Sequence, residues 1–179
     1  MGLATFKGGI HPYEGKELSM SKPVSVLQPK GEMVFPLSQH IGAPAKPLVA
    51  KGDHVLVGQK IGEPGGFISA CIISSVSGTV KSLEPRMVAN GAMVPSIIVE
   101  NDGMYETVEG FGEDRDPKTL SKEEIRNIVK EAGIVGLGGA GFPTHVKLTP
   151  KDESAIDTII VNGAECEPYL TSDYRMMLE

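Results

Sequence analysis

Short apolar runs separated by turn residues dominate the first half of the chain. Val55, Val57 and Ile61 are spaced as one face of a strand, and they follow the turn sequence KGD at residues 51–53. Further runs rich in β-branched residues follow at 72–73, 76–80 and 97–99. Short strands punctuated by turns are typical of a small β-barrel or sandwich. The pattern predicts such a domain over residues 33–100.

The strongest helical pattern comes later, in residues 121–133. One apolar face is formed at helical spacing by Ile125, Ile128, Val129 and Ala132. The sequence SKEE at residues 121–124 has the spacing of a capping box, in which the serine oxygen and the second glutamate satisfy backbone N–H groups reciprocally. Gly133 is placed to end the helix as its C′ residue. We therefore expect an amphipathic helix with defined ends.

The last apolar run is IDTIIV at residues 156–161, which predicts a largely buried strand. In open α/β sheets ligands bind at the carboxyl ends of strands, so this strand would deliver Asn162 and Glu165 to a site. The predicted fold class is α+β or α/β. Its predicted parts are an extended Gly- and Pro-rich arm at 1–32, the β domain at 33–100, an acidic linker at 101–120 and the start of an α/β domain at 121–179.

Composition narrows the possible functions. The 179 residues carry a net charge of -6, which opposes general nucleic-acid binding because phosphate contacts need a basic surface. No run approaches the roughly 18 apolar residues needed to cross a bilayer, so we expect no direct membrane insertion and a cytoplasmic chain. The two cysteines, Cys71 and Cys166, are too few for a disulfide framework or for a four-thiolate iron–sulfur cluster. We expect no metal site in this segment.

Residues 136–141 contain four glycines in six positions: Gly136, Gly138, Gly139 and Gly141. Backbone N–H groups without neighbouring Cβ atoms can approach and bind an anion such as a phosphate. The run satisfies G-x-G-x-x-G, but a helix precedes it and Pro143 follows it, which does not fit a Rossmann site. No Gly-Lys-Ser/Thr follows, so it is not a Walker loop. The alternative is a packing loop without a ligand.

Side chains near these glycines suggest a ligand. Lys147 lies close enough in sequence to reach a phosphate or flavin ring, although an exposed lysine is also a common surface residue. Phe142 offers a flat face to an aromatic ring, with core packing as the alternative. Glu165 and Glu167 alternate around Cys166 and would accept hydrogen bonds from ribose hydroxyls or a nicotinamide amide. Their alternative is an acidic surface turn.

Several runs together resemble known proteins. The sequences GLGGAGFPTHVK at 136–147 and VNGAECEP at 161–168 resemble the flavin and NADH site of the flavin-bearing subunit of respiratory complex I. The sequences GGIHP at 8–12, PLSQHIG at 36–42 and SVSGTV at 75–80 resemble the C subunit of the Rnf ion-translocating electron transport complex. The resemblance runs through the whole chain in the same order. A cobalamin reductase of microcompartments shares the glycine loop and is an alternative.

The resemblance implies an NADH-oxidising, FMN-binding subunit that passes electrons to 4Fe–4S clusters outside this segment. It implies a membrane-associated complex with other subunits as partners, peripheral to the cytoplasmic side of the membrane, and an NADH-dependent oxidoreductase and translocase activity. The implied cofactor-binding residues are Gly136, Gly138, Gly139, Gly141, Phe142, Lys147, Asn162, Glu165 and Glu167. Hydride transfer requires stacking and orientation, so no catalytic side chain is expected.

Some positions depart from the resemblance. Leu137 stands where the complex I loop has an arginine, and Ala164 stands where it has an acidic residue. The end of the chain, YRMMLE at 174–179, reads as a helix in progress, so we expect an N-terminal fragment with an incomplete flavin pocket. The β domain resembles the biotinyl and lipoyl carrier fold, yet no lysine lies between Ile61 and Val80. It is therefore expected to be structural, and a non-catalytic docking module is the competing function.

Overall fold

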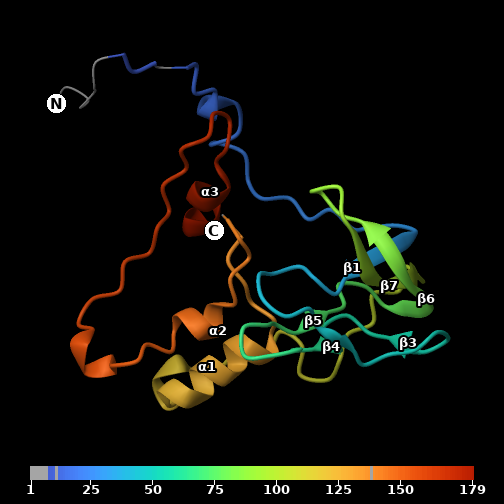
Figure 1. Cartoon of the computed structure of the whole chain (residues 1–179). Coiled ribbons are helices and arrows are strands. Elements are labelled where there is room, and N and C mark those ends of the chain that lie inside the picture. The colour runs from blue at the N-terminus through green and yellow to red at the C-terminus, as the bar shows by residue number, and fades with distance from the viewer. Residues whose placement is uncertain (1–7, 11, 138) are drawn as a thin grey trace. The chain divides into compact units, whose positions relative to one another are not determined.

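The computed structural model describes residues 8–10, 12–137 and 139–179 (Figure 1). The chain forms two compact units. One unit is continuous, Pro29–Ala155, and contains the β domain and the glycine-rich loop. The other combines the two ends of the chain, Met1–Gln28 and Ile156–Glu179. The glycine-rich run and the acidic run at residues 162–168 therefore belong to different units.

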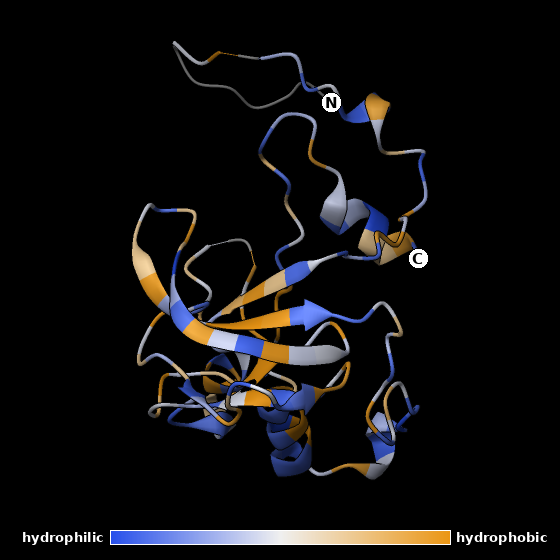
Figure 2. Ribbon diagram, turned by 90° about the vertical axis from the view of Figure 1, so that its right-hand side faces the viewer, coloured by the Kyte–Doolittle hydropathy of each residue, from blue (hydrophilic) through white to orange (hydrophobic). Residues whose placement is uncertain are grey.

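Two antiparallel sheets form the β domain, as the sequence pattern predicts. The larger sheet has the strand order β1-β7-β6-β3 and the smaller has the order β2-β4-β5. The strands of the larger sheet are β1 (Glu32–Pro36), β7 (Met93–Asn101), β6 (Gly78–Met87) and β3 (His54–Val55). Those of the smaller sheet are β2 (Lys46–Pro47), β4 (Lys60–Glu63) and β5 (Ile72–Ile73). Hydrophobic and hydrophilic bands alternate along the long strands (Figure 2).

A single apolar cluster fills the β domain. Val55 and Ile61 are fully buried, as expected, but Val57 is only half-buried. Val55 lies on β3 and Ile61 on β4, in different sheets, so the single strand face predicted from their spacing is wrong. The remaining buried members of the cluster are Phe35, Leu37, Ala45, Ile72, Val76, Val80, Ile97 and Val99. Both sheets contribute residues to this cluster, so their apolar faces pack against each other. Burial of these side chains is the main stabilising contribution to this domain.

Gly42 shows how closely the backbone packs in this domain. It has a φ of 103°. A Cβ there would overlap the carbonyl oxygen of Ile68. Ala43 beside it donates its N–H to the same oxygen over 2.9 Å. A side chain at this position is thus excluded by both its dihedral angle and its neighbour.

Helix α1 (Lys122–Glu131) has the predicted ends. Ser121 caps it, accepting a hydrogen bond from the Glu124 N–H, and the Glu124 carboxylate accepts one from the Ser121 N–H. Gly133 follows the C-cap with a φ of 67°. A Cβ on Gly133 would lie 2.5 Å from the carbonyl oxygen of Cys71, so the chain leaves the helix pressed against the β domain. The capping box and the C′ glycine are confirmed.

The predicted strand at residues 156–161 is wrong. The segment has no regular secondary structure, and Ile159, Ile160 and Val161 expose 79–88% of their surface. A strand requires a neighbour to pair its backbone groups, and all strands in the described part of the chain lie between residues 32 and 101. Apolar composition alone therefore does not form a strand here. The segment instead links η3 (Glu153–Ala155) to the acidic run.

Helix α3 (Ser172–Leu178) and the 3-10 turn η1 (Lys16–Leu18) are the regular elements of the unit built from the two chain ends. The arm runs along the loop before α3 and along the helix itself. Tyr169 donates its N–H to the Glu14 carbonyl over 2.6 Å, and Val24 donates its N–H to the Glu179 carboxylate over 3.1 Å. The remaining short elements are η2 (Pro117–Thr119) and α2 (Thr144–Lys147).

Candidate functional site

The glycine-rich run forms a closed loop between α1 and α2. Val135 pairs with Pro143 as an antiparallel bridge. The Gly136 N–H donates to the Phe142 carbonyl over 3.0 Å, and the Thr144 N–H donates to the Ile134 carbonyl over 3.0 Å. These bonds hold both ends of the loop together. A helix precedes the loop, which confirms that its setting is not that of a Rossmann fingerprint.

Gly136 and Lys147 are brought together by this arrangement. An ideal Cβ on Gly136 would lie 2.7 Å from the Lys147 Nζ, closer than real Cβ contacts. The lysine side chain therefore folds back from α2 over the start of the loop, in the space that a side chain at Gly136 would take. An ammonium beside a glycine backbone combines two features suited to a phosphate, a positive charge and close access to the main chain.

The other glycines of the loop differ in their surroundings. Gly139 has no atom within 4 Å of an ideal Cβ, so it faces open space. Gly141 has a φ of 63°, and a Cβ there would lie 3.0 Å from the Gln39 carbonyl oxygen and 3.2 Å from the His40 Cα. Gly141 thus serves packing against the β domain. Gly138, which we also expect to bind the cofactor, lies outside the described residues.

Two aromatic residues adjoin the loop. Phe142 is half-buried and contributes its carbonyl to the closure of the loop. Burial lowers the pKa of His145, and the charge of Lys130 lowers it further, so the ring is neutral at pH 7. The His145 Nδ1 is buried without a hydrogen-bond partner among the described residues. The positive charge next to the loop therefore comes from lysines.

The acidic run at residues 162–168 forms a turn held by the N-terminal arm. The Asn162 Oδ1 accepts a hydrogen bond from the Ala164 N–H over 3.0 Å, which closes the turn with the side chain we expect to bind the cofactor. The Lys16 Nζ donates to the carbonyl oxygens of Glu165 over 2.9 Å and of Glu167 over 3.3 Å. It also donates to the Leu170 carbonyl over 2.9 Å.

The Glu165 carboxylate caps helix α3. It accepts hydrogen bonds from the Asp173 N–H at 2.9 Å, the Tyr174 N–H at 3.3 Å and the Ser172 hydroxyl at 3.1 Å. Burial alone would raise the pKa of this carboxyl, but the hydrogen bonds from Asp173 and Tyr174 outweigh it and hold the pKa below its ordinary value. Glu165 is therefore ionised at neutral pH and fixes the start of the helix.

This cap predicts a pH dependence. A depressed pKa in the folded state stabilises the helix start above the ordinary carboxyl value of 4.5, and this contribution is lost as the pH falls through the lower, folded pKa. In an NMR titration, the amide signals of Asp173 and Tyr174 should therefore move together with a midpoint below 4.5. Glu165→Gln should abolish that transition. A midpoint at or above 4.5 would contradict the cap.

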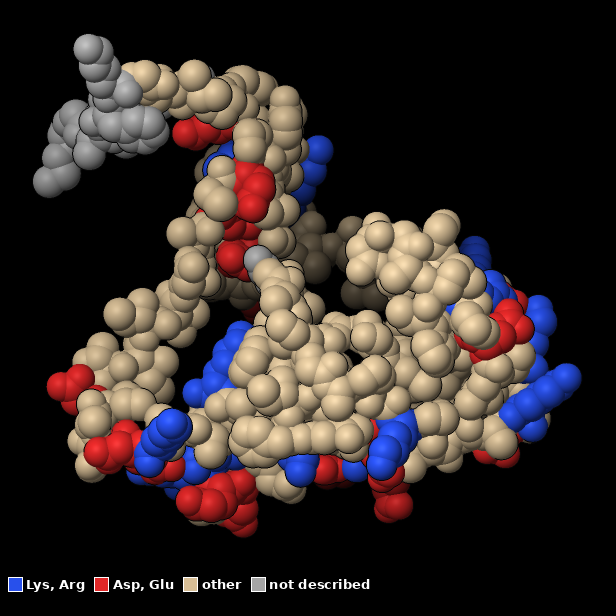
Figure 3. Space-filling model, viewed as in Figure 1, with Lys and Arg blue, Asp and Glu red and all other residues tan. Residues whose placement is uncertain are grey.

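A pocket of about 270 Å³ opens beside this turn. Its walls come from both segments of the unit, the arm and the acidic run. The lining residues are Pro12, Glu14, Lys16, Glu165, Cys166, Glu167 and Pro168. Acidic side chains are visible in this part of the molecule (Figure 3). Glu165 caps α3 and the Lys16 ammonium donates to backbone carbonyls, so the carboxylates of Glu14 and Glu167 supply the acceptors of the pocket, which suits a ligand rich in hydroxyl or amide groups.

Sequence reasoning missed Glu14 and Lys16 as neighbours of the acidic run. Neither has a periodic or motif context, because the surrounding arm alternates glycine, proline and polar residues. A weak signal was present in Gly15. This residue is buried with a φ of 62°, and a Cβ there would overlap the Tyr169 ring. A glycine between two charged residues can indicate such a close contact.

The structure also bears on metal binding, on the two cysteines and on membrane-spanning helices. Among residues 8–10, 12–137 and 139–179, no three histidine, cysteine or acidic side chains converge as a metal site. Cys71 is buried, which raises the pKa of its thiol, and Cys166 is exposed. Within the same ranges, no helix has the length and apolar character to span a membrane.

Comparisons with known proteins divide the chain in two. Residues 4–104 match the family model described as the RnfC barrel sandwich hybrid domain. Residues 129–179 match the Nuo51 FMN-binding domain. The first match covers the whole β domain and most of the arm. The second begins within α1 and includes the glycine loop, the acidic run and α3.

Curated relatives align along nearly the whole chain, and each is the C subunit of an ion-translocating oxidoreductase complex. The chain is 46% identical over 177 residues to that of the proton-translocating ferredoxin:NAD(+) oxidoreductase complex of Clostridium ljungdahlii, covering 99% of this chain. It is 46% identical over 176 residues to that of the Na(+)-translocating ferredoxin:NAD(+) oxidoreductase complex of Acetobacterium woodii, covering 97% of this chain. It is 40% identical over 179 residues to that of an ion-translocating oxidoreductase complex of Haemophilus influenzae, covering 99% of this chain. The chain spans 39% of the length of the first two relatives and 27% of the third.

Proposed function

Because this chain belongs to the RnfC family, which comprises the C subunits of Rnf-type ion-translocating oxidoreductase complexes, we propose that it forms part of an electron-transfer flavoprotein. That protein would bind FMN and oxidise NADH. The two domains of this chain are the RnfC barrel sandwich hybrid domain and a Nuo51 FMN-binding domain. The observation that carries the proposal is the position of the Lys147 ammonium against Gly136 at the base of the closed loop. The names of the relatives supply the pyridine nucleotide as a candidate substrate.

The loop fits the phosphate end of FMN. Gly139 leaves open space where a side chain would otherwise stand, and Lys147 supplies a positive charge at the start of the loop. Hydrogen bonds hold the two ends of the loop together before a ligand arrives, which lowers the entropic cost of binding. We assign phosphate binding to Gly136, Gly138, Gly139 and Lys147. Gly141 and Phe142 would support the same site.

The acidic turn fits the hydroxyl-rich parts of the ligands. We assign the FMN ribityl chain and ring to Asn162 and Glu165, and NADH to Glu167. The Glu165 carboxylate already accepts the hydrogen bonds that cap α3. Its contribution to the site would therefore be mainly to hold the turn in shape. Exposed carboxylates such as Glu167 accept hydrogen bonds from hydroxyl and amide donors.

The cofactor would supply the redox chemistry, and the protein would supply binding and orientation. FMN, held by Gly136, Gly139 and Lys147, would supply the chemistry that connects a two-electron hydride donor to one-electron acceptors. The chain's own residues would bind the phosphate, orient the ring and hold the nucleotide beside it, without an acid–base side chain. Because Cys71 and Cys166 are the two cysteines here, the 4Fe–4S clusters that receive the electrons would lie outside residues 1–179. The membrane complex at the cytoplasmic face would then receive them.

The test is flavin reduction in the full-length protein. Purified protein should contain FMN, or bind it on reconstitution, and its absorbance at about 450 nm should bleach on titration with NADH, with more than about one equivalent needed per flavin because the clusters also accept electrons. The 179-residue chain alone should bind FMN weakly or not at all, because an incomplete pocket is less preorganised. Full-length protein without bound or reconstitutable FMN would contradict the proposal.

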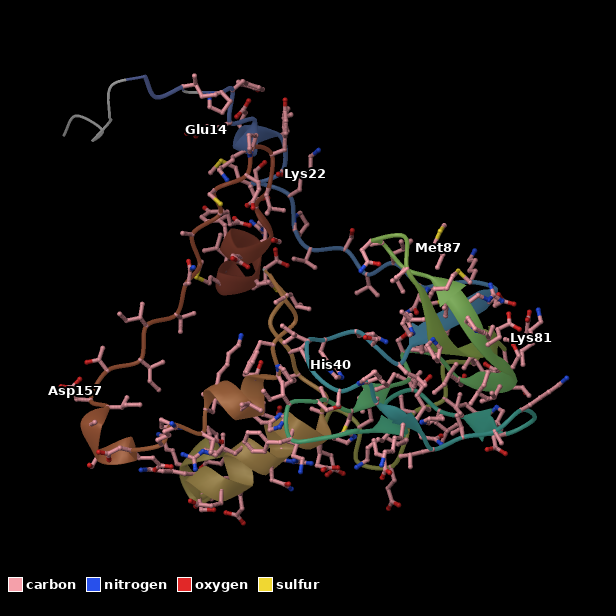
Figure 4. The ribbon with its side chains drawn as sticks, viewed as in Figure 1. Glu14, Lys22, His40, Lys81, Met87 and Asp157 are labelled. Atoms are coloured by element: carbon pink, nitrogen blue, oxygen red, sulfur yellow. The ribbon has the colours of Figure 1, made fainter. Side chains whose placement is uncertain are left out.

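A second role, docking to other subunits, has its own supporting observation. Residues 87–99 contain no charged side chain and form the tip of the β6–β7 hairpin and most of β7. Met87 and Met93 flank this tip and expose 73% and 62% of their surface. Figure 4 shows Met87 pointing away from the sheet. Methionine is common at protein-binding surfaces because its flexible side chain adapts to the partner. The docking role is compatible with flavin binding by the other domain.

A further inference from the structure

We propose that Lys16 is a positioning residue of the nucleotide site, so that the N-terminal arm forms part of that site. The inference rests on the proposed function, because it assumes that the acidic turn meets NADH and the flavin. It adds a residue from a segment that lies 149 positions away in sequence from Glu165. The observation that supports it is that three main-chain carbonyls accept hydrogen bonds from one ammonium.

The contacts of Lys16 fit a positioning role. Its Nζ has three donors, and it donates to the carbonyls of Glu165, Glu167 and Leu170. These carbonyls span both the acidic turn and the residues that lead into α3. Hydrogen bonds from a charged donor are stronger than neutral ones, and three of them from one atom define the curvature of the segment. Lys16 therefore sets the shape of the turn through its backbone.

Neighbouring contacts hold Lys16 in place. Gly15 is buried under the Tyr169 ring, and Tyr169 itself has a φ of 66°, an uncommon conformation for a residue with a side chain. The N–H of Tyr169 donates to the Glu14 carbonyl, and Ser19 donates its hydroxyl to the Tyr169 carbonyl over 3.2 Å. The arm thus contacts the turn on both sides of Lys16, which fixes the approach of the ammonium.

The consequence concerns the side chains of the turn. Glu167 lines the pocket together with Glu14 and Lys16, and its direction follows from the backbone that Lys16 holds. Loss of the ammonium would leave three carbonyls without their donor and release the turn. A shift of about 1 Å in a group that positions a substrate can reduce its effectiveness by about a hundredfold. We therefore expect an effect on nucleotide binding from a residue that need not touch the nucleotide.

The experiment compares Lys16→Met with Lys22→Met in the full-length, FMN-loaded protein. Methionine matches the length of lysine but has no donor. Lys22 lies on the same arm and is exposed (Figure 4). With ferricyanide as the electron acceptor, Lys16→Met should raise the KM for NADH about tenfold while kcat per bound flavin stays within about twofold. Lys22→Met should leave both constants unchanged.

Each outcome has a distinct meaning. An unchanged KM in Lys16→Met, or a loss of kcat and flavin with KM unchanged, would overturn the positioning role. Lys16→Arg supplies a second variant that keeps the charge but replaces the compact ammonium with a planar group, and its KM should fall between wild type and Lys16→Met. A KM for Lys16→Arg above that of Lys16→Met would contradict the inference. Wild-type protein that NADH does not reduce would contradict the proposed function itself.

Discussion

Lys147→Met in the full-length protein should weaken FMN binding by about 10- to 100-fold, the equivalent of one charge-assisted hydrogen bond. The ammonium lies against Gly136 at the base of the loop, so its removal leaves a phosphate there without its cation. Lys147 is exposed, so the substitution should leave the fold intact. The dissociation constant is measured by flavin fluorescence during reconstitution. Lys151→Met, an exposed lysine nearby, is the control and should bind FMN as the wild type does.

Gly136→Ala tests the same contact from the other side. The added methyl group would meet the flexible end of Lys147 and displace it, at little cost to the fold because a side-chain terminus can move. The two substitutions should therefore be non-additive, since the alanine removes the same interaction that methionine removes. Fully additive losses would show that Gly136 and Lys147 act separately. Unchanged FMN affinity in Lys147→Met would contradict the phosphate role of the lysine.

The second large effect is on stability. Ile97→Ala should lower the free energy of unfolding of the β domain by about 2 to 5 kcal/mol, because it leaves a cavity in the core. Ile97 is fully buried on β7 and belongs to the apolar cluster shared by both sheets. Few neighbours can move to fill the space, since they are themselves held in strands. Denaturant unfolding of the 179-residue chain, followed by circular dichroism, measures the change.

Met93→Ala is the matched control for Ile97→Ala. Both residues lie on β7, but Met93 exposes 62% of its surface and precedes the buried part of the strand. Its truncation should change the free energy of unfolding by less than about 0.5 kcal/mol. Equal losses for the two variants would show that the strand, and not the core side chain, determines stability. A loss below about 1 kcal/mol for Ile97→Ala would contradict the packing described for this domain.

The sequence predicts elements well where the signal is local. The capping box at Ser121 and the C′ role of Gly133 depend on residues a few positions apart, and both are confirmed. The β domain is also predicted, because turns and alternating apolar residues repeat along residues 33–100. These features require no knowledge of distant partners. The match to the RnfC and Nuo51 domains agrees with the resemblance read from the motifs.

Predictions that depend on distant partners fare differently. The apolar run at 156–161 was expected to be a strand, yet strand formation depends on a neighbour that no local pattern reveals. The partnership of Lys16 with the acidic turn could not be predicted either, since a single lysine in an irregular arm has no periodicity. Gly141 lies close to the backbone of Gln39 and His40, a contact that its sequence context does not reveal. The cofactor roles assigned to the loop and the turn stay predictions.

The unit built from the two chain ends has a consequence for the order of folding during synthesis. The arm leaves the ribosome before the β domain, but its partners at Glu165, Glu167 and Leu170 are made about 150 residues later. The β domain and α1 lie entirely within that interval and can fold while the arm waits. When the arm makes these contacts, it closes a long loop of chain. Because the β domain and α1 within that loop are already folded, closing it costs less chain entropy. Lys16 therefore reaches its final position only after the acidic turn has been translated.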